Sequence, residues 1–428
     1  MTSLSSPNRR AIESDQLDKL CSLLSLLPSN PFYRRKLQAA GITPSLSGLE
    51  DFSKRMPFTL KQELIDDQCE NPPYGSNLSY SLERYARLSQ TSATTGKPMR
   101  WLDTAEDWGW MLNNWTRVYQ AAGVTSRDRI FFAFSFAPFL GFWTAFESAV
   151  RLGCMCIPGG GLSSVARLRM ILENEITVLC CAPTYALRLA EVAAQEEVKL
   201  SGSKVKRIIV AGEPGGSIPS TCAEIERSWP GARVVDHHGM TEVGPVSYGC
   251  PKRPGILHVI ESSYIAEVID FATGQAVQPG EKGELVLTNL GRTGSPLLRY
   301  RTGDLVQPCA EQPCACGSYE LGLQGGILGR TDDMVVVRGV NIYPSAVEEI
   351  IRSCGGVAEF RVEIPSDRTL PELTIKAEAF PGQQEPKELA ERLEAALRSA
   401  FALRIPVSIV PSGTLPRFEM KARRWVRV

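Results

Sequence analysis

Residues 205–214 read VKRIIVAGEP, an apolar, β-branched run that ends in a turn containing glycine and proline. A short apolar run with such an end is typical of a buried strand. Similar runs recur at 129–136 (RIFFAFSF), 177–183 (TVLCCAP) and 233–239 (RVVDHHG). Between them, residues 168–175 and 185–197 space their apolar side chains as helices do. Strands that alternate with helices predict an α/β fold of layered sheets.

The pattern changes towards the C-terminus. Residues 264–290 contain short apolar runs separated by turns, which predict a small antiparallel β unit. Further along, residues 335–337 are a strand candidate and residues 345–353 a helix candidate. A second helix candidate, residues 386–403, has one apolar face formed by Leu389, Leu393, Leu397 and Phe401. The last ~100 residues are therefore expected to form a separate α+β domain.

Composition limits the classes of function. The 428 residues suggest about two to three domains. Lys plus Arg and Asp plus Glu number 47 each, so no net charge recruits nucleic acid or an acidic membrane, and a small-molecule partner is expected. The start of the chain has no apolar signal-like region, and no run of about 18 apolar residues could cross a bilayer. We therefore expect a cytoplasmic location, where the 12 cysteines are reduced or bind metal.

Residues 87–100, RLSQTSATTGKPMR, form a candidate phosphate-binding loop. Hydroxyl groups donate to phosphate oxygens, glycine lets the backbone approach an anion, and lysine adds positive charge. The candidate residues are Ser92, Thr94, Thr95, Gly96 and Lys97. The loop is not a P-loop, because Thr91 stands where that motif has its first glycine and Pro98 stands where it has Ser or Thr. A solvated Ser/Thr loop is the alternative reading of this stretch alone.

Two candidate segments follow predicted strands. In VDHHGMTEVGP (235–245), Thr241 can donate to a phosphate oxygen and Glu242 can bind Mg²⁺, which prefers a few carboxylates plus substrate phosphates. In AGEPGG (211–216), the loop can meet a base or ribose, since ligands bind at the carboxyl ends of strands in open α/β sheets. The candidate nucleotide-binding residues of these two loops are Gly212, Glu213, Pro214, Asp236, His237, His238 and Gly239.

Three further segments lie downstream. In LLRYRTGDL (297–305), Asp304 can accept hydrogen bonds from both ribose hydroxyls through its two oxygens. GRTDDMVVVRGVNIYP (329–344) and LPRFEMKARR (415–424) complete the series. Each segment alone has a plain alternative, namely a turn, a solvated loop or a solvated charge.

Taken in order, the six segments resemble the AMP-forming adenylating superfamily of acyl-CoA synthetases, luciferases and nonribosomal adenylation domains. Within it, they are most similar to the phenylacetate-CoA ligase family, from about residue 87 to residue 421. The resemblance implies a phosphate loop at 92–97, an adenine contact at 212–214, and phosphate and Mg²⁺ roles for Thr241 and Glu242. It also implies a ribose contact for Asp304, and a ribose and phosphate contact for Arg330.

The resemblance also implies a division of labour between domains. Residues 1–329 would form the N-terminal core, residues 330–333 the hinge with Asp332 at its centre, and residues 334–428 a mobile C-terminal domain. Lys421 matches the mobile lysine that bridges the carboxylate and the α-phosphate during adenylation, so it is the candidate catalytic residue beside Thr241 and Glu242. Two positions depart from the family pattern: His238 replaces an adenine-stacking tyrosine, and Ala93 follows Ser92 where glycine is commoner.

A metal site can be assembled from Cys250, His258, Cys314 and Cys316, with Cys309 in reserve. Thiolate and imidazole ligands suit structural zinc, although Cys-x-Cys is tighter than the usual spacing. Many members of the resembled family carry a similar cysteine and histidine pattern. Cysteine is also frequent in cores as a small hydrophobe, so reduced, unligated thiols are the alternative.

Aromatic residues suggest the acyl group. Binding pockets are mostly apolar with a few polar groups, and the candidates here are Phe134, Phe136, Pro138, Tyr185 and, for a polar substituent, His237. Aromatic residues in a strand and helix also serve simply as core.

The expected activity is ATP-dependent conversion of an aryl or arylacetic acid to an acyl-adenylate, followed by transfer to CoA. Two alternatives differ in kind: an enzyme that loads a carrier-protein phosphopantetheine, and a zinc-bearing scaffold without catalysis. The scaffold would have lost Lys421 or Glu242, and both are present. The expected partners are ATP, Mg²⁺, a carboxylic acid and CoA, with a possible homodimer.

Overall fold

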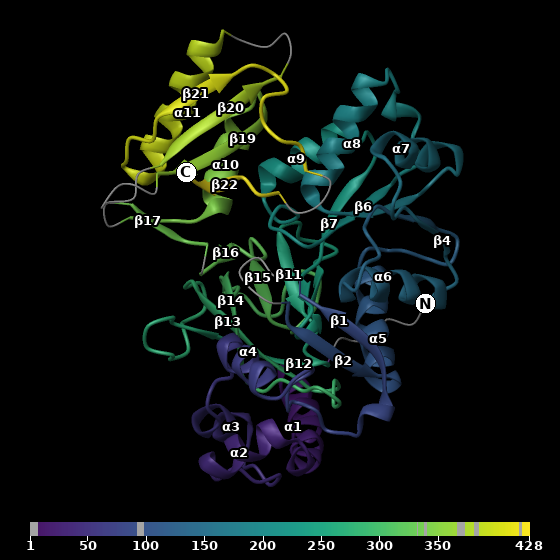
Figure 1. Ribbon diagram of the computed structural model, residues 1–428, viewed down its shortest axis with the longest axis vertical. Helices are drawn as coiled ribbons and strands as arrows, with labels where there is room; N and C mark the ends of the chain where they lie inside the picture. The colour runs from purple at the N-terminus through teal and green to yellow at the C-terminus, as the bar shows by residue number, and fades with distance from the viewer. Residues whose placement is uncertain are drawn as a thin grey trace.

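A computed structural model describes residues 7–91, 98–331, 333–337, 340–365, 373–380, 385–418 and 422–428. The N-terminal helices and the C-terminal domain lie at opposite ends of its long axis (Figure 1). The predictions for Ser92, Thr94, Thr95, Gly96, Lys97, Asp332 and Lys421 fall outside the described residues.

A five-stranded parallel sheet lies at the centre of the larger part, as the apolar runs predict. Its strand order is β4 (Met155–Pro158), β3 (Arg129–Phe132), β5 (Val178–Cys181), β6 (Arg207–Val210) and β7 (Arg233–Asp236). The edge strand β4 has no counterpart among the predicted strands. It is only partly buried, and Met155 is 59% exposed, as is usual for a strand at the edge of a sheet.

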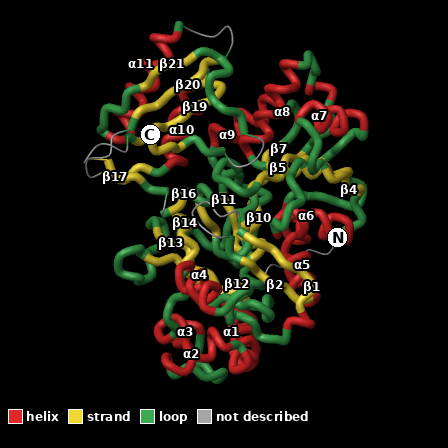
Figure 2. The backbone as a smooth tube through the Cα atoms, viewed as in Figure 1, coloured by secondary structure: helices red, strands yellow, loops and turns green. Residues whose placement is uncertain are grey.

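Side chains alternate between the two faces of this sheet, and each face has its own hydrophobic core. Ile130, Phe132 and Ile209 contribute to one core, beneath α5 (Ala105–Ala121) and α6 (Leu140–Arg151). Phe131, Ile208 and Val210 contribute to the other core, beneath α7 (Ser164–Glu173), α8 (Pro183–Gln195) and α9 (Pro219–Ser228). Helices therefore cover both faces of the sheet (Figures 1 and 2), which confirms the predicted α/β class.

Antiparallel strands extend the core, as predicted for residues 264–290. One sheet has the order β12 (Tyr264–Ile269), β13 (Gly283–Asn289), β14 (Tyr300–Val306) and β16 (Gly329–Arg330). A second has the order β10 (Ser247–Gly249), β11 (Ile256–Val259) and β15 (Gly322–Gln324). The short pair β8 (Gly239–Met240) and β9 (Gly244–Pro245), and the hairpin β1 (Tyr85–Gln90) and β2 (Arg100–Thr104), complete this part.

The N-terminal helices support the antiparallel sheet. They are α1 (Arg9–Leu26), α2 (Pro31–Ala40), α3 (Leu49–Arg55) and α4 (Lys61–Glu70). A short 3₁₀ helix, Leu27–Ser29, joins α1 to α2, and two others lie further along the chain at Leu82–Arg84 and Leu200–Gly202. Fully buried Tyr33 of α2 accepts a hydrogen bond from the Leu298 backbone N–H at 2.9 Å. This contact fixes the loop before β14, which carries Asp304.

The C-terminal domain has a separate core. Its sheet has the order β21 (Val407–Val410), β20 (Thr374–Ala379), β19 (Val357–Ile364) and β22 (Trp425–Arg427). It packs with α10 (Pro344–Cys354) and α11 (Pro386–Phe401), and the hairpin β17 (Val335–Val337) and β18 (Val340–Ile342) precedes it. On α11, Leu389, Leu393 and Leu397 are fully buried and Phe401 packs beside them, as the helical spacing predicts.

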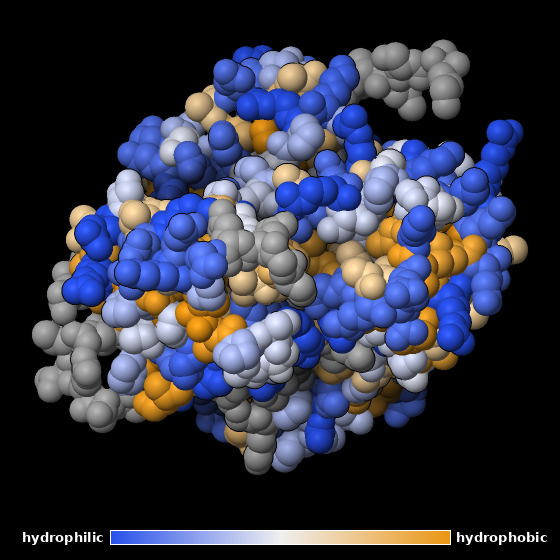
Figure 3. Space-filling view, turned by 90° about the horizontal axis from the view of Figure 1, so that it is seen from above, coloured by the Kyte–Doolittle hydropathy of each residue, from blue (hydrophilic) through white to orange (hydrophobic). Residues whose placement is uncertain are grey.

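No helix among the described residues is long and apolar enough to cross a membrane. On the face seen from above, hydrophilic and hydrophobic residues are interspersed (Figure 3).

Candidate active site

The candidate nucleotide loops meet at the carboxyl edge of the parallel sheet. Strand β6 ends at Val210, just before Gly212, Glu213 and Pro214, and its last residue pairs with Asp236 at the end of β7. Because the strands are parallel neighbours, the two loops that follow them lie side by side. The structure thus brings together the residues that the sequence suggested for adenine.

Asp236 uses both carboxylate oxygens inside the protein. Ser217 Oγ donates to Oδ2 at 2.6 Å, and the His237 backbone N–H donates to Oδ1 at 3.0 Å. Burial raises the pKa of Asp236 to about 6, against the lowering effect of these hydrogen bonds. Through these two hydrogen bonds, Asp236 stabilises the conformation of the loop after β7.

His237 is a neutral imidazole. Its Nδ1 lies 2.6 Å from the Ser247 carbonyl oxygen, which only accepts, so Nδ1 carries the proton and Nε2 remains an acceptor. The ring packs against Trp115, with 4.2 Å between ring centroids. Burial lowers the pKa of His237 to about 3.

His238 lies beside Asp304. Its Nε2 is 2.9 Å from Asp304 Oδ2, while Arg330 Nη1 donates to Asp304 Oδ1 at 3.3 Å. Asp304 on β14 and Arg330 on β16 are direct cross-strand partners, which explains why residues 26 positions apart meet. The residue at the family's adenine-stacking position is thus hydrogen-bonded to the candidate ribose-binding carboxylate.

Glu242 is buried, with two groups near its carboxylate. Tyr300 Oη donates to Oε1 at 3.4 Å, and Lys61 Nζ lies 3.6 Å from the same oxygen. The ammonium group of Lys61 partly balances the charge of the Glu242 carboxylate. A single carboxylate such as that of Glu242 can bind a Mg²⁺ ion that also binds phosphate oxygens.

A buried ion pair, missed at the sequence level, holds the loop that carries Thr241 and Glu242. Arg292 Nη1 donates to the carbonyl oxygens of Thr241 at 2.7 Å and Glu242 at 2.9 Å. Its Nε and Nη2 donate to the two oxygens of Asp103 at 2.6 and 2.8 Å, and both side chains are fully buried. Asp103 lies on β2, directly after the candidate phosphate loop. No local pattern marks this pair, because its members are 189 positions apart.

The carboxylate of Glu213 accepts two backbone hydrogen bonds from distant parts of the chain. Its Oε1 accepts from the Thr184 backbone N–H at 3.0 Å, and its Oε2 accepts from the Ala422 backbone N–H at 2.8 Å. The loop after β6 is therefore joined to the C-terminal segment.

The acyl-pocket candidates do not line one slot. Phe134 stacks on Phe142 with centroids 3.8 Å apart, and Phe136 meets Trp143 edge-on at 5.0 Å. Tyr185 instead is fully buried in the core on the opposite face of the sheet, where its hydroxyl lies 3.0 Å from Ser164 Oγ. Pro138 is exposed, and its carbonyl accepts from Gln90 N–H at 2.8 Å. The spacing of apolar residues in 185–197 predicts a helix, but it does not show which face of the sheet that helix covers.

The four metal-ligand candidates converge. The ligand atoms of Cys250, His258, Cys314 and Cys316 all lie within 4.8 Å of one another. Cys250 Sγ is 3.7 Å from Cys314 Sγ, and Cys316 Sγ is 3.4 Å from His258 Nε2. Cys309 packs nearby but is not part of this group of ligand atoms.

Comparison with known proteins agrees with this architecture. Residues 60–291 match the AMP-binding enzyme family, and residues 339–427 match the AMP-binding enzyme C-terminal domain. The first match contains the parallel sheet, and the second contains the sheet of the C-terminal domain.

Curated relatives narrow the class. A phenylacetate-coenzyme A ligase of Thermus thermophilus is 30% identical over 96% of this chain and 94% of its own length. Another from Escherichia coli is 30% identical over 92% of this chain and 89% of its own length. The chain therefore belongs to the AMP-binding enzyme family, in the group of the phenylacetate-coenzyme A ligases. It is an AMP-forming acid–CoA ligase.

Solved structures add the arrangement of the domains. A 2-hydroxyisobutyryl-CoA ligase in the postadenylation state, bound to 2-HIB-AMP, is 27% identical and covers 99% of this chain and 91% of its own, with a TM-score of 0.93. The same ligase in the thioesterification state, at 28% identity with 99% and 91% covered, has a TM-score of 0.74. The whole chain is thus more similar to the postadenylation arrangement.

Proposed function

We propose that this protein uses ATP to activate an aromatic, aryl or arylacetic, carboxylic acid and transfers the acyl group to CoA. The phenylacetate-coenzyme A ligase relatives support this acid class, together with the aromatic cluster around Phe134 and Phe136. The convergence of the candidate nucleotide loops at one sheet edge supports the first step.

In the first step, a carboxylate oxygen attacks the α-phosphorus of ATP and pyrophosphate leaves. Two anions must approach each other, so positioning and charge neutralisation supply most of the catalysis. We assign this neutralisation to Lys421, with Thr241 donating to a phosphate oxygen. Glu242 would hold a Mg²⁺ ion, which would supply further positive charge beside the phosphates. In the second step, the CoA thiolate attacks the acyl carbonyl carbon and AMP leaves.

The other candidate residues are assigned to the parts of the nucleotide and to the two domains. Ser92, Thr94, Thr95, Gly96 and Lys97 would hold the phosphates, and Asp304 and Arg330 the ribose. The loops at 212–214 and 236–239 would border the adenine. Residues 1–329 and 334–428 would act as separate domains about a hinge at 330–333. The cytoplasmic location and the homodimer stay predictions.

We also propose a structural zinc ion at Cys250, His258, Cys314 and Cys316. Ligands about 2.3 Å from zinc in a tetrahedron lie about 3.8 Å apart, close to the observed sulfur–sulfur separation. His258 would bind through Nε2, since its Nδ1 faces the Glu320 carbonyl oxygen at 3.3 Å. These four residues would fill all the ligand positions of a tetrahedral ion, which suits a structural role. Less than about a tenth of an equivalent of zinc in the purified protein would exclude it.

The activity is tested by acid-dependent pyrophosphate release, with and without CoA. The panel contains benzoic and phenylacetic acids and a short aliphatic hydroxy acid. We expect release with arylacetic or aryl acids, and CoA-thioester formation when CoA is added. Release without CoA consumption would favour a carrier-protein acceptor, and preference for the hydroxy acid would overturn the aromatic assignment.

A further inference from the structure

Glu213 joins three parts of the protein that are far apart in the sequence. It lies in the loop after β6, and its carboxylate accepts backbone N–H groups from Thr184 and Ala422. Thr184 lies in the first turn of α8, where backbone N–H groups lack helical partners and attract negative charge. Ala422 belongs to the segment that leads into the last strand, β22. One carboxylate thus fastens the C-terminal segment to the start of a core helix.

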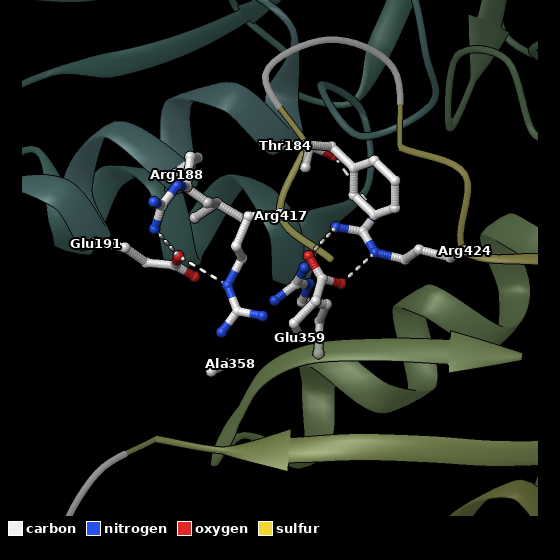
Figure 4. A pocket seen from close by; sticks show the side chains of 10 residues that line it. Thr184, Arg188, Glu191, Ala358, Glu359, Arg417 and Arg424 are labelled. Atoms are coloured by element: carbon white, nitrogen blue, oxygen red, sulfur yellow. Dashed lines mark hydrogen bonds and ion pairs between the residues drawn. The ribbon is translucent and has the colours of Figure 1, made fainter. Parts of the chain in front are cut away.

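Neighbouring ion pairs hold the same segment on α8. Arg424 is buried and donates to Thr184 Oγ1 at 3.4 Å, while its other bonds reach Glu359 of β19 and Glu348 of α10. Arg417 donates to Glu191 of α8 at 3.2 Å and to Glu378 of β20 at 2.6 Å. Figure 4 shows Arg417 directed towards Glu191 and Arg424 towards Glu359. Both ends of the segment 417–424 are therefore attached to the large core.

The charges around Glu213 are complementary. Burial raises the pKa of Glu213, and the positive charge of Arg424 opposes that effect. A carboxylate that accepts two N–H groups forms charge-assisted hydrogen bonds, which are stronger than those between neutral groups. Because Ala422 belongs to the C-terminal domain and Glu213 to the large core, this hydrogen bond requires the arrangement of the two parts seen here.

Resting on the proposed function, we propose that Glu213 is a positioning residue for the adenylation step. Lys421 directly precedes Ala422, and consecutive Cα atoms are about 3.8 Å apart, so the anchored N–H limits where that lysine can reach. Glu213 thereby favours the domain arrangement in which Lys421 serves the first half-reaction. This role differs from the adenine contact that its place in the motif suggests.

The test compares Glu213→Gln with Glu226→Gln in the full-length enzyme. Glutamine keeps the size of the side chain, but its NH₂ group would face one of the two N–H donors. Glu226 is an exposed glutamate of α9 that accepts the Val234 N–H at 3.0 Å within the large core, so it is a matched control. Hydrogen exchange of residues 422–428 is measured without substrates. Both half-reactions are then measured separately, as acid-dependent ATP–pyrophosphate exchange and as thioester formation from synthetic acyl-adenylate.

For Glu213→Gln we expect faster exchange of the Ala422 amide and an adenylation rate about ten- to a hundredfold lower, since a hydrogen bond to a charged group is lost. The thioester step should stay within about twofold, which also shows that the variant is folded. Unchanged Ala422 protection, equal losses in both half-reactions, or a raised KM for ATP with unchanged kcat would each overturn the proposal. If the unmodified enzyme adenylates no acid, the proposed function fails, while the exchange measurement still decides whether Glu213 anchors Ala422.

Discussion

Two buried side chains near the sheet edge, His237 and Asp236, have strongly shifted pKa values. His237 and Asp236 are adjacent, yet burial moves their pKa values in opposite directions, to about 3 and about 6. Burial disfavours the charged form of each group, and that form is the cation for histidine and the anion for aspartate. In mildly acidic solution, His237 is therefore uncharged and Asp236 is partly protonated. The loop after β7 then carries little charge at these two residues.

Replacing His237 should make the protein less sensitive to acid. The folded pKa of about 3 lies below the unfolded value of about 6.5, so below pH 6.5 the unfolded chain binds a proton that the folded chain excludes. The stabilising effect is complete above pH 6.5 and falls by at most about 1.4 kcal/mol per pH unit as the pH drops. Urea unfolding at pH 7, 6 and 5 should show a shallower decline for His237→Asn than for the unmodified protein. The Asp236 contribution has the opposite sign but is common to both proteins, and parallel curves would contradict the prediction.

Removing the amine of Lys421 should separate the two half-reactions. We expect Lys421→Ala to lower adenylation by about 100- to 1000-fold, because a positive charge at the developing phosphate charge is lost. Thioester formation from synthetic acyl-adenylate should remain largely intact. Lys387→Ala, which alters an exposed lysine of the same domain, is the control. Equal losses in both half-reactions would show that Lys421 has another role.

At the level of secondary-structure elements, the Arg292–Asp103 pair connects β2 with the loop between β8 and β9. This loop carries Thr241 and Glu242, and β2 follows the candidate phosphate loop. A fully buried ion pair is costly to break, because one charge then remains without a partner in a nonpolar setting. The pair therefore orders the side of the site to which we assign the phosphates.

Arg292→Ala should lower the free energy of unfolding by about 3–5 kcal/mol, since Asp103 stays buried and uncompensated. Urea denaturation measures this change. Arg127→Ala, at an exposed position, should change stability by less than about 0.5 kcal/mol. Adding Asp103→Ala to the first variant should cost much less than Asp103→Ala alone, because the two residues interact directly. Additive effects would mean that the pair contributes little.

Over the whole molecule, the hydrophobic cores are divided between two parts of the chain. The core of the C-terminal domain consists of residues from 335 to 425, and the parallel sheet has separate cores on its two faces. Contacts between these parts include polar ones, such as Ser220 Oγ to Glu349 at 2.8 Å and those of Arg417 and Arg424. Polar interfaces permit relative movement of domains more readily than apolar ones.

Leu393→Ala should therefore destabilise one domain selectively. Leu393 is fully buried in the C-terminal core, and a leucine-to-alanine change in a core costs about 2–5 kcal/mol. Calorimetry should show a lower Tm for one transition and little change in the other. A single transition that shifts as a whole would show that the two parts unfold as one unit.

The sequence by itself determined what depends on neighbours along the chain. Apolar runs marked β3, β5 and β6, because inner parallel strands are buried on both faces, and a similar run marked the edge strand β7. Helical spacing marked α11, and the order of short motifs marked the family. Strand β4 and the N-terminal helices were not predicted from these patterns.

Tertiary structure alone decided which distant side chains meet. The pairing of Arg292 with Asp103, the contact of Glu213 with Ala422, and the burial of Tyr185 on the opposite face of the sheet all depend on how elements pack. The sequence suggested Cys250, His258, Cys314 and Cys316 as one ligand set, and the tertiary structure brings their ligand atoms within 4.8 Å of one another. The physical reason is that periodicity records the local backbone conformation, whereas contacts across hundreds of residues depend on the packing of the whole chain.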